Sequence, residues 1–148
     1  MECMIEYVWG KHTRISVNYT YSDFRFEKYT SGNTDYSGLR QPMIPNHKWN
    51  LTMDARLFKT IDFNVLLSYY SKMMLNDGNE SFTDTSYECN MALSSSEKLS
   101  QHFIIGLQAN NLFNLTQYSN FRANAAFQRY YEAASLMHFG VFVKVDVD

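Results

Sequence analysis

The closing stretch of the chain, residues 137–147, constrains the fold most strongly because its residues alternate in character with a period of two. One set of side chains is apolar and the other is polar, with Phe142 as an apolar exception in the polar set. In a helix these residues would spread around the whole cylinder, so the pattern indicates a β-strand. The apolar set must be covered by a protein core or by a lipid bilayer, and it comprises Met137, Phe139, Val141, Val143, Val145 and Val147.

The same alternation recurs in the segments that precede the closing stretch. In residues 15–22, apolar side chains such as Ile15 and Val17 alternate with Ser16 and Asn18. Further segments of this kind lie at residues 5–9, 49–57, 61–70, 86–94 and 102–110, and Leu66 is an apolar exception in the fourth segment of the chain. This pattern predicts an all-β fold in which residues 1–148 form one antiparallel up-and-down meander of about seven strands.

Composition narrows the environment in which such a sheet can exist. The chain has 148 residues and a formal net charge of −2, which argues against a nucleic-acid partner because phosphate binding requires an excess of clustered Lys and Arg. Mean hydropathy is −0.37, and no stretch has the roughly 18 uninterrupted apolar residues of a membrane helix. Aromatic residues make up 16% of the chain, which fits a sheet with aromatic girdles.

The connections between the predicted strands alternate between short and long. Short reversals are expected near Gly10, Lys59 and Glu97, and longer connections follow Thr30, Asn76 and Asn111. Both prolines, Pro42 and Pro45, lie in a long connection. Outer-membrane barrels have short periplasmic turns and long external loops. We therefore expect part of a transmembrane β-barrel with a periplasmic C-terminus, while a soluble ligand-binding β-barrel remains the alternative.

The two ends of the chain and its two cysteines lead to further expectations. Residues 1–6 lack the basic and apolar regions of a signal peptide, so we expect the chain to be mature or incomplete at its front. Cys3 and Cys89 could form a disulfide or serve as small apolar fillers, and we expect the second. The chain ends at Val147 and Asp148.

Two motifs resemble TonB-dependent outer-membrane receptors, especially those of the Bacteroidetes type. The segment from Gly106 to Asn114, which contains Asn-Asn-Leu-Phe-Asn, resembles the signature at the penultimate strand of those barrels. The segment from Pro42 to Leu51 resembles a proline-containing lead into a strand several positions from the barrel end. The resemblance implies the C-terminal barrel portion of a receptor for nutrient uptake, in which a plug domain absent from these residues takes part.

The chain departs from that family at its terminus, because such barrels commonly end on an aromatic residue. An odd number of strands is also unusual for a bacterial single-chain barrel. The expected partners are therefore outer-membrane lipid, the remaining barrel strands or another barrel chain, and a transported ligand that the sequence does not identify. The alternative within the membrane is a small structural or adhesive barrel that is completed by an eighth strand or by another chain.

The candidate site residues fall into two groups. A hydrated polar wall that faces the barrel lumen is expected from Asp54, Arg56, Asp62, Glu88 and Lys144. An external loop is expected to contact the ligand through Arg122, Arg129, Tyr130 and Tyr131, or to supply a tyrosine belt at the membrane surface. We expect no catalytic residue, cofactor or metal site, because no nucleophile motif is present and the antiparallel register separates His102 from His138.

Overall fold

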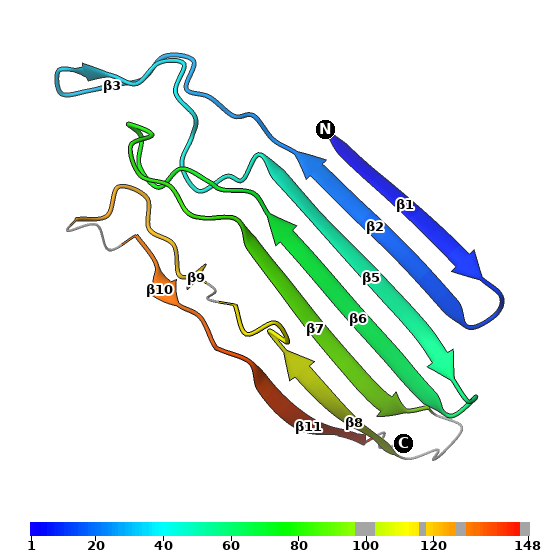
Figure 1. Cartoon of the computed structure of the whole chain (residues 1–148). Coiled ribbons are helices and arrows are strands. Elements are labelled where there is room, and N and C mark those ends of the chain that lie inside the picture. Colours follow the sequence, from blue (N-terminus) through cyan, green and yellow to red (C-terminus); the bar gives the residue numbers. More distant parts are fainter. Residues whose placement is uncertain (97–102, 116–117, 127–129, 146–148) are drawn as a thin grey trace.

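The computed structural model describes residues 1–96, 103–115, 118–126 and 130–145, and within them the predicted meander is confirmed (Figure 1). Seven strands form one antiparallel sheet in the order β1-β2-β5-β6-β7-β8-β11. Their bounds are β1 Glu2–Trp9, β2 Thr13–Tyr21, β5 His47–Leu57, β6 Ile61–Tyr70, β7 Ser86–Ser95, β8 Phe103–Asn110 and β11 His138–Val145. Each strand thus pairs with its predecessor in this series, as an up-and-down topology requires.

Short two-stranded pairs in the long connections were not predicted from the sequence. In the β2–β5 connection, β3 (Thr30–Ser31) pairs with β4 (Thr34–Asp35) in a projecting hairpin. In the β8–β11 connection, β9 (Tyr118–Ser119) pairs with β10 (Glu132–Ala133). These pairs are too short to produce a visible alternation in the sequence.

In the described residues, the short turns after β1 and β5 lie at one end of the strands and the long connections lie at the other end, as predicted (Figure 1). The reversal predicted near Glu97 lies outside the described residues. At the turn end of the strands, β5 reverses into β6 through a turn in which Phe58 and Lys59 have φ angles of +50° and +63°. Positive φ at both central residues gives the twist that a tight hairpin needs, although neither residue is Gly or Asn. The opposite end, which we call the loop end, carries three long connections: loop A (residues 22–46), loop B (residues 71–85) and loop C (residues 111–137).

The strand register places the apolar set of every strand on one face, which we call the apolar face. Along one row of paired positions, for example, Val17 lies opposite Leu51, Leu51 opposite Leu67, and Leu67 opposite Cys89. A slip of one residue between any two strands would mix the two faces. The alternation in each segment and the pairing between segments therefore agree.

Large side chains on the apolar face are exposed, which is the reverse of the arrangement in a soluble domain. Phe139 and Val141 are each 71% exposed, and Leu107 on the neighbouring strand is 59% exposed. Among the described residues, the buried hydrophobic side chains are Ala55, Leu75 and Cys89. An exposed apolar surface of this extent marks an interaction surface, because soluble monomers rarely tolerate one.

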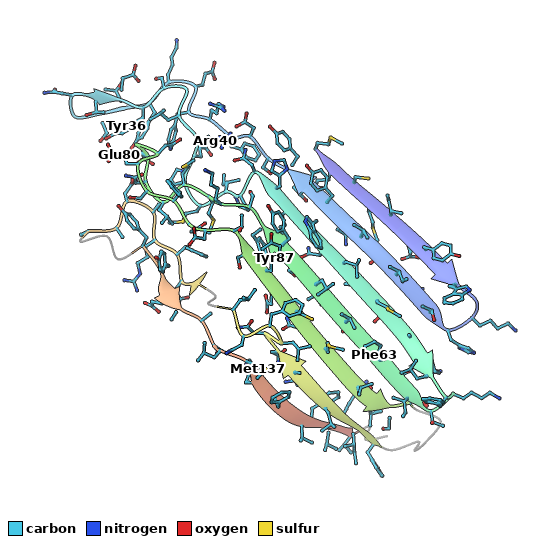
Figure 2. All side chains as sticks on the ribbon, viewed as in Figure 1. Tyr36, Arg40, Phe63, Glu80, Tyr87 and Met137 are labelled. Carbon is cyan, nitrogen blue, oxygen red and sulfur yellow. The ribbon has the colours of Figure 1, made fainter. Side chains whose placement is uncertain are left out.

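Aromatic side chains form a row across the loop end of the apolar face. Tyr19, Trp49, Tyr69 and Tyr87 occupy paired positions on four neighbouring strands. The ring centroids of Trp49 and Tyr69 are 5.5 Å apart, and those of Tyr69 and Tyr87 are 5.1 Å apart. Tyr87 lies in the loop half of β7, whereas Phe63 lies towards the turn end of β6 (Figure 2).

The two cysteines do not form a disulfide. Cys3 is exposed on β1 and Cys89 is buried on β7, and both thiols are free. They share the apolar face, but β2, β5 and β6 separate their strands. At about 4.8 Å per strand spacing, four spacings far exceed the reach of a disulfide.

Candidate functional site on the polar face and the loops

The polar face near the short turns carries cross-strand pairs of complementary side chains. Arg56 and Asp62 are opposite one another on β5 and β6, and the Arg56 Nε lies 2.7 Å from the Asp62 Oδ1. The adjacent pair consists of Asp54 and Asn64, whose amide donates a hydrogen bond to the carboxylate. These groups line a cavity of about 410 Å³ that also includes Lys11, His12 and Arg14.

A second cavity, of about 430 Å³, lies where the polar face meets the loops. We call it the loop-end cavity. Its floor comes from the loop ends of β5, β6 and β7, and its walls come from all three loops. The lining residues are Met43, Pro45, Lys48, Tyr70, Ser71, Met73, Thr83, Asp84, Ser86, Glu88 and Phe121. Hydrogen-bonding groups among apolar side chains are the usual lining of a ligand site.

The three charged residues that line the loop-end cavity differ in the contacts that their side chains make. The Lys48 Nζ lies 5.3 Å from the centroid of the Tyr70 ring, which is a cation–π contact. The Glu88 Oε1 accepts a hydrogen bond of 2.8 Å from the Asn90 amide. Asp84 is exposed and forms no hydrogen bond or ion pair with the part of the chain that the structure describes. Its carboxylate is therefore available to a solute.

The predicted polar wall is divided between these two places. Asp54, Arg56 and Asp62 line the cavity at the turn end, whereas Glu88 lines the loop-end cavity. Lys144 shares the polar face but lies on the edge strand β11, opposite Ile104, and lines neither cavity. The five residues therefore share one face without forming one site.

The residues predicted to contact a ligand from the external loop likewise do not all line one cavity. Tyr130 and Tyr131 line a cavity of about 330 Å³ together with Leu75 and Phe82 from loop B. Arg122 instead forms an ion pair with Glu132, with 2.7 Å between the Nη2 and the Oε1. Arg129 lies outside the described residues.

Three residues that were not predicted from the sequence line the loop-end cavity with Glu88. Lys48 could have been found by extending the alternation of residues 49–57 back by one position. Tyr70 belongs to the alternation of residues 61–70, but nothing in the sequence indicates its contact with Lys48. Asp84 lies in loop B outside any strand, so no periodicity marks it.

Side-chain amides connect the three loops. Asn79 in loop B exchanges two hydrogen bonds with the backbone of Arg40 in loop A, at 2.9 Å to the Arg40 amide and 2.8 Å to its carbonyl. Asn124 in loop C accepts from the Asp77 amide at 2.9 Å and donates to the Asp77 carboxylate at 2.8 Å. In Figure 2, Tyr36, Arg40 and Glu80 mark the region where loops A and B meet. Loop B is thus tied to both of its neighbours.

The Asn-Asn-Leu-Phe-Asn motif is a structural junction. Asn111 is 3% exposed and has a φ of +50°. Its Nδ2 donates to the carbonyl of Leu115 at 2.8 Å, and its Oδ1 accepts from the Leu115 amide at 3.2 Å. Its own amide donates to the Asn90 Oδ1 at 3.0 Å. The motif therefore ends β8 and fixes the start of loop C against β7.

Metal-binding residues do not cluster in the described ranges, where no group of three or more His, Cys, Asp or Glu side chains could hold an ion. The His138 Nε2 lies 3.1 Å from the Asn110 amide nitrogen, and the His47 Nδ1 lies 2.9 Å from the Tyr19 hydroxyl. His102 lies outside the described residues. No helix in the described part of the chain is long and apolar enough to cross a membrane.

Comparison with solved structures identifies the fold. The chain superposes on the siderophore receptor PiuA from Acinetobacter baumannii with a TM-score of 0.78 and 16% sequence identity, covering 96% of this chain and 20% of that one. The ferric-catecholate import receptor Fiu from Escherichia coli K12 gives 0.72 and 12%, with 96% and 20% covered. A mutant ferric enterobactin receptor PfeA from Pseudomonas aeruginosa gives 0.64 and 14%, with 96% and 21% covered.

These matches confirm, for the fold, the resemblance to TonB-dependent outer-membrane receptors. The chain has the fold of part of their β-barrel and spans about a fifth of their length. No protein-family model matches the sequence, and no curated protein matches it.

Proposed function

We propose that the chain is the C-terminal barrel portion of a TonB-dependent outer-membrane receptor for nutrient uptake, whose loops A, B and C are external. The observation that carries this proposal is the open apolar face, which runs across all seven strands in register while the opposite face is polar. Lipid on one side and a hydrated lumen on the other account for both faces. The shared fold with siderophore receptors supports the same assignment.

The dimensions of the apolar face match those of a membrane sheet. From Trp49 in the aromatic row to Leu57 at the turn end, the strand rises by about 26 Å at roughly 3.3 Å per residue. A strand tilt of about 40° reduces this to about 20 Å, close to the apolar band of outer-membrane barrels. The aromatic row then lies at one membrane interface, as tyrosine and tryptophan girdles do.

Both edges of the sheet support a larger barrel. β1 and β11 are paired on one side only, and the eight residues of β1 are all exposed. Long exposed edge strands with apolar side chains require a partner, because they otherwise aggregate. We infer that the partners are the remaining strands of the same receptor. The partner in the alternative, a small structural or adhesive barrel, is another chain.

A soluble ligand-binding barrel is the least consistent with the exposed apolar face, since such a barrel turns its apolar side chains inward. The role that we propose is transport, without catalysis, cofactor or resident metal. The solved structures that share the fold are named as receptors, which agrees with a non-enzymatic role.

Cell fractionation and gel mobility test this proposal. We expect the protein to sediment with outer membranes and to migrate differently in SDS gels before and after heating. Recovery of the protein in the soluble fraction without detergent would contradict it.

The orientation is tested by labelling with a maleimide that does not cross membranes, in a Cys3→Ser background. We expect Asn33→Cys, in the projecting hairpin of loop A, to be labelled on intact cells. Lys59→Cys, in a short turn, should be labelled only after the outer membrane is opened. The opposite result would reverse the orientation while leaving the barrel assignment in place.

A further inference from the structure

The loop-end cavity has an unusual charge balance for a protein that shares its fold with receptors named for ferric catecholate and ferric enterobactin. Its lining contains two carboxylates, Asp84 and Glu88, and one cation, Lys48, so its formal charge is −1. The cation is held over the Tyr70 ring, and the Asp84 carboxylate is unpaired among the described residues. The net charge of the cavity lining is therefore negative.

The loops around the cavity reinforce that sign. Loop B carries Asp77, Glu80 and Asp84 against Lys72, a balance of −2. Loop A has three acidic and three basic residues, so it is neutral. Loop C has two basic residues, Arg122 and Arg129, and one acidic residue, Glu132, so its balance is +1, and Arg122 is ion-paired with Glu132. A further cavity of about 340 Å³ between the loops is lined by Asp35, Asp77 and Glu80 and by no Lys or Arg. The three loops together carry a formal charge of −1, which is the same sign as the charge of the loop-end cavity.

The uncharged part of the lining favours a solute rich in hydroxyl groups. Tyr70 and Ser86 contribute hydroxyl groups that can donate and accept hydrogen bonds, whereas the hydroxyl groups of Ser71 and Thr83 already accept hydrogen bonds from the amides of His47 and Met73. Phe121 from loop C, together with Met43 and Met73, supplies apolar surface at the same cavity. A ligand with both polar edges and apolar faces would satisfy the two kinds of group at once.

We propose that the loop-end cavity binds a neutral or cationic polyhydroxylated solute through Asp84, Glu88 and the neighbouring hydroxyl groups, and that it disfavours anions such as ferric catecholates. The inference rests on the proposed receptor function and names the substrate class of that site. Asp84 supplies a carboxylate at the solvent side, and Glu88 supplies one on the strand floor. An anionic ligand would meet two carboxylates and one cation, Lys48, so the net charge of the lining would repel it.

Three trisaccharides of equal length but different charge test this discrimination. The probes are a glucosamine trimer, which is cationic, maltotriose, which is neutral, and a galacturonic acid trimer, which is anionic. Calorimetric titration of the detergent-purified receptor that contains this chain gives the Kd of each. We expect the cationic trimer to bind about three- to tenfold more tightly than the neutral one, and the anionic trimer to bind most weakly. The difference should shrink as salt is raised.

Substitution of the two carboxylates tests whether they cause the preference for the cationic trimer. Asp84→Asn should weaken binding of the cationic trimer towards the level of maltotriose, and it should weaken maltotriose binding by less, because asparagine loses the charge but keeps a side-chain oxygen that accepts hydrogen bonds. Asp84→Asn combined with Glu88→Gln should also improve binding of the anionic trimer. Asp54→Asn is the matched control, because it removes the same charge from the same face but lines the cavity at the turn end. It should change none of the three affinities.

The outcomes separate the two proposals. A membrane-inserted, heat-modifiable receptor that binds the anionic trimer or ferric enterobactin more tightly, with no response to Asp84→Asn, overturns the inference on the solute and leaves the receptor function standing. A protein that does not enter the outer membrane overturns both.

Discussion

The ring of Phe142 lies directly over the backbone of Gly106. The two residues are paired across β8 and β11 on the polar face, and a Cβ atom built at Gly106 would clash with the ring, with the Phe142 Cε2 only 2.8 Å away. Aromatic cover of a strand glycine stabilises a sheet at the position where glycine would otherwise weaken it. This contact explains why the alternation of the closing strand is interrupted by an apolar residue.

Gly106→Ala should destabilise the sheet by about 1–3 kcal/mol, because the added methyl group must displace the Phe142 ring. In a Phe142→Ala background the same change should be neutral or stabilising, since alanine outperforms glycine by about 0.5–1 kcal/mol in a strand. Free energies of unfolding from urea titration in detergent, arranged as a double-mutant cycle, measure this coupling. Gly140→Ala is the control, because its Cβ would meet only the flexible end of Gln108. Equal effects of Gly106→Ala in both backgrounds would show that the contact is not formed.

Asn111 should be sensitive to substitution for two separable reasons. Asn111→Gly keeps the left-handed backbone but removes the side-chain hydrogen bonds to Leu115, and we expect a loss of about 1–2 kcal/mol. Asn111→Ala removes the same bonds and also places a Cβ at positive φ, which should add about 1 kcal/mol. Urea titration of both variants gives the order. Equal stability of the two variants would argue against the left-handed backbone at this position.

Asn79→Gly should release loop A from loop B, and glycine tolerates the φ of +57° that Asn79 adopts. It removes both hydrogen bonds to the Arg40 backbone, which together contribute about 2 kcal/mol to holding the loops together. We expect trypsin to cleave after Arg40 about tenfold faster or more, because cleavage follows the population of the opened loop. Cleavage after Lys28, in the part of loop A beyond this contact, should be unchanged and serves as the control. An unchanged rate at Arg40 would show that the two loops are held by other contacts.

The loop A hairpin should depend on pH through Asp35. Its carboxylate accepts hydrogen bonds from the Ser37 hydroxyl at 2.6 Å and the Ser37 amide at 2.9 Å, and these bonds hold its pKa below the ordinary value. A lowered pKa in the folded hairpin means that the stabilisation is complete above the ordinary pKa and is lost as the pH falls through the lowered one. NMR should show the Ser37 amide moving upfield and exchanging faster in acid. Asp35→Asn should abolish that pH dependence, and a response that persists in the variant would assign it to another group.

The sequence predicts the strands and their faces well because one face of every strand meets a uniform environment. The pairing of Leu51 with Leu67 follows from the alternation and from the short turn between β5 and β6. The turn at Phe58 and Lys59 could be located from the strands around it, but its residue types do not indicate positive φ. The short connections force neighbouring strands into register whatever their turn chemistry.

The candidate site is less predictable, because loop contacts join residues far apart in the sequence. The strands β5 and β6 lie between Arg40 and Asn79 in the sequence, and β7, β8 and β9 lie between Asp77 and Asn124. Such contacts have no periodicity. Phe142 departs from the alternation because it covers Gly106, whereas no single contact explains the departure at Leu66.

Fluorescence quenching by brominated lipids tests most directly whether the apolar face contacts the bilayer. Leu51 and Thr52 are adjacent on β5 but point to opposite faces, so each is replaced by Trp in a Trp9→Phe, Trp49→Phe background and reconstituted in vesicles. We predict strong quenching of Leu51→Trp by bromine part-way between the headgroups and the bilayer centre, and little quenching of Thr52→Trp. Native Trp49, kept as the single tryptophan, should be quenched most by bromine near the headgroups. Equal quenching at positions 51 and 52, or none at position 51, would contradict a lipid-facing sheet.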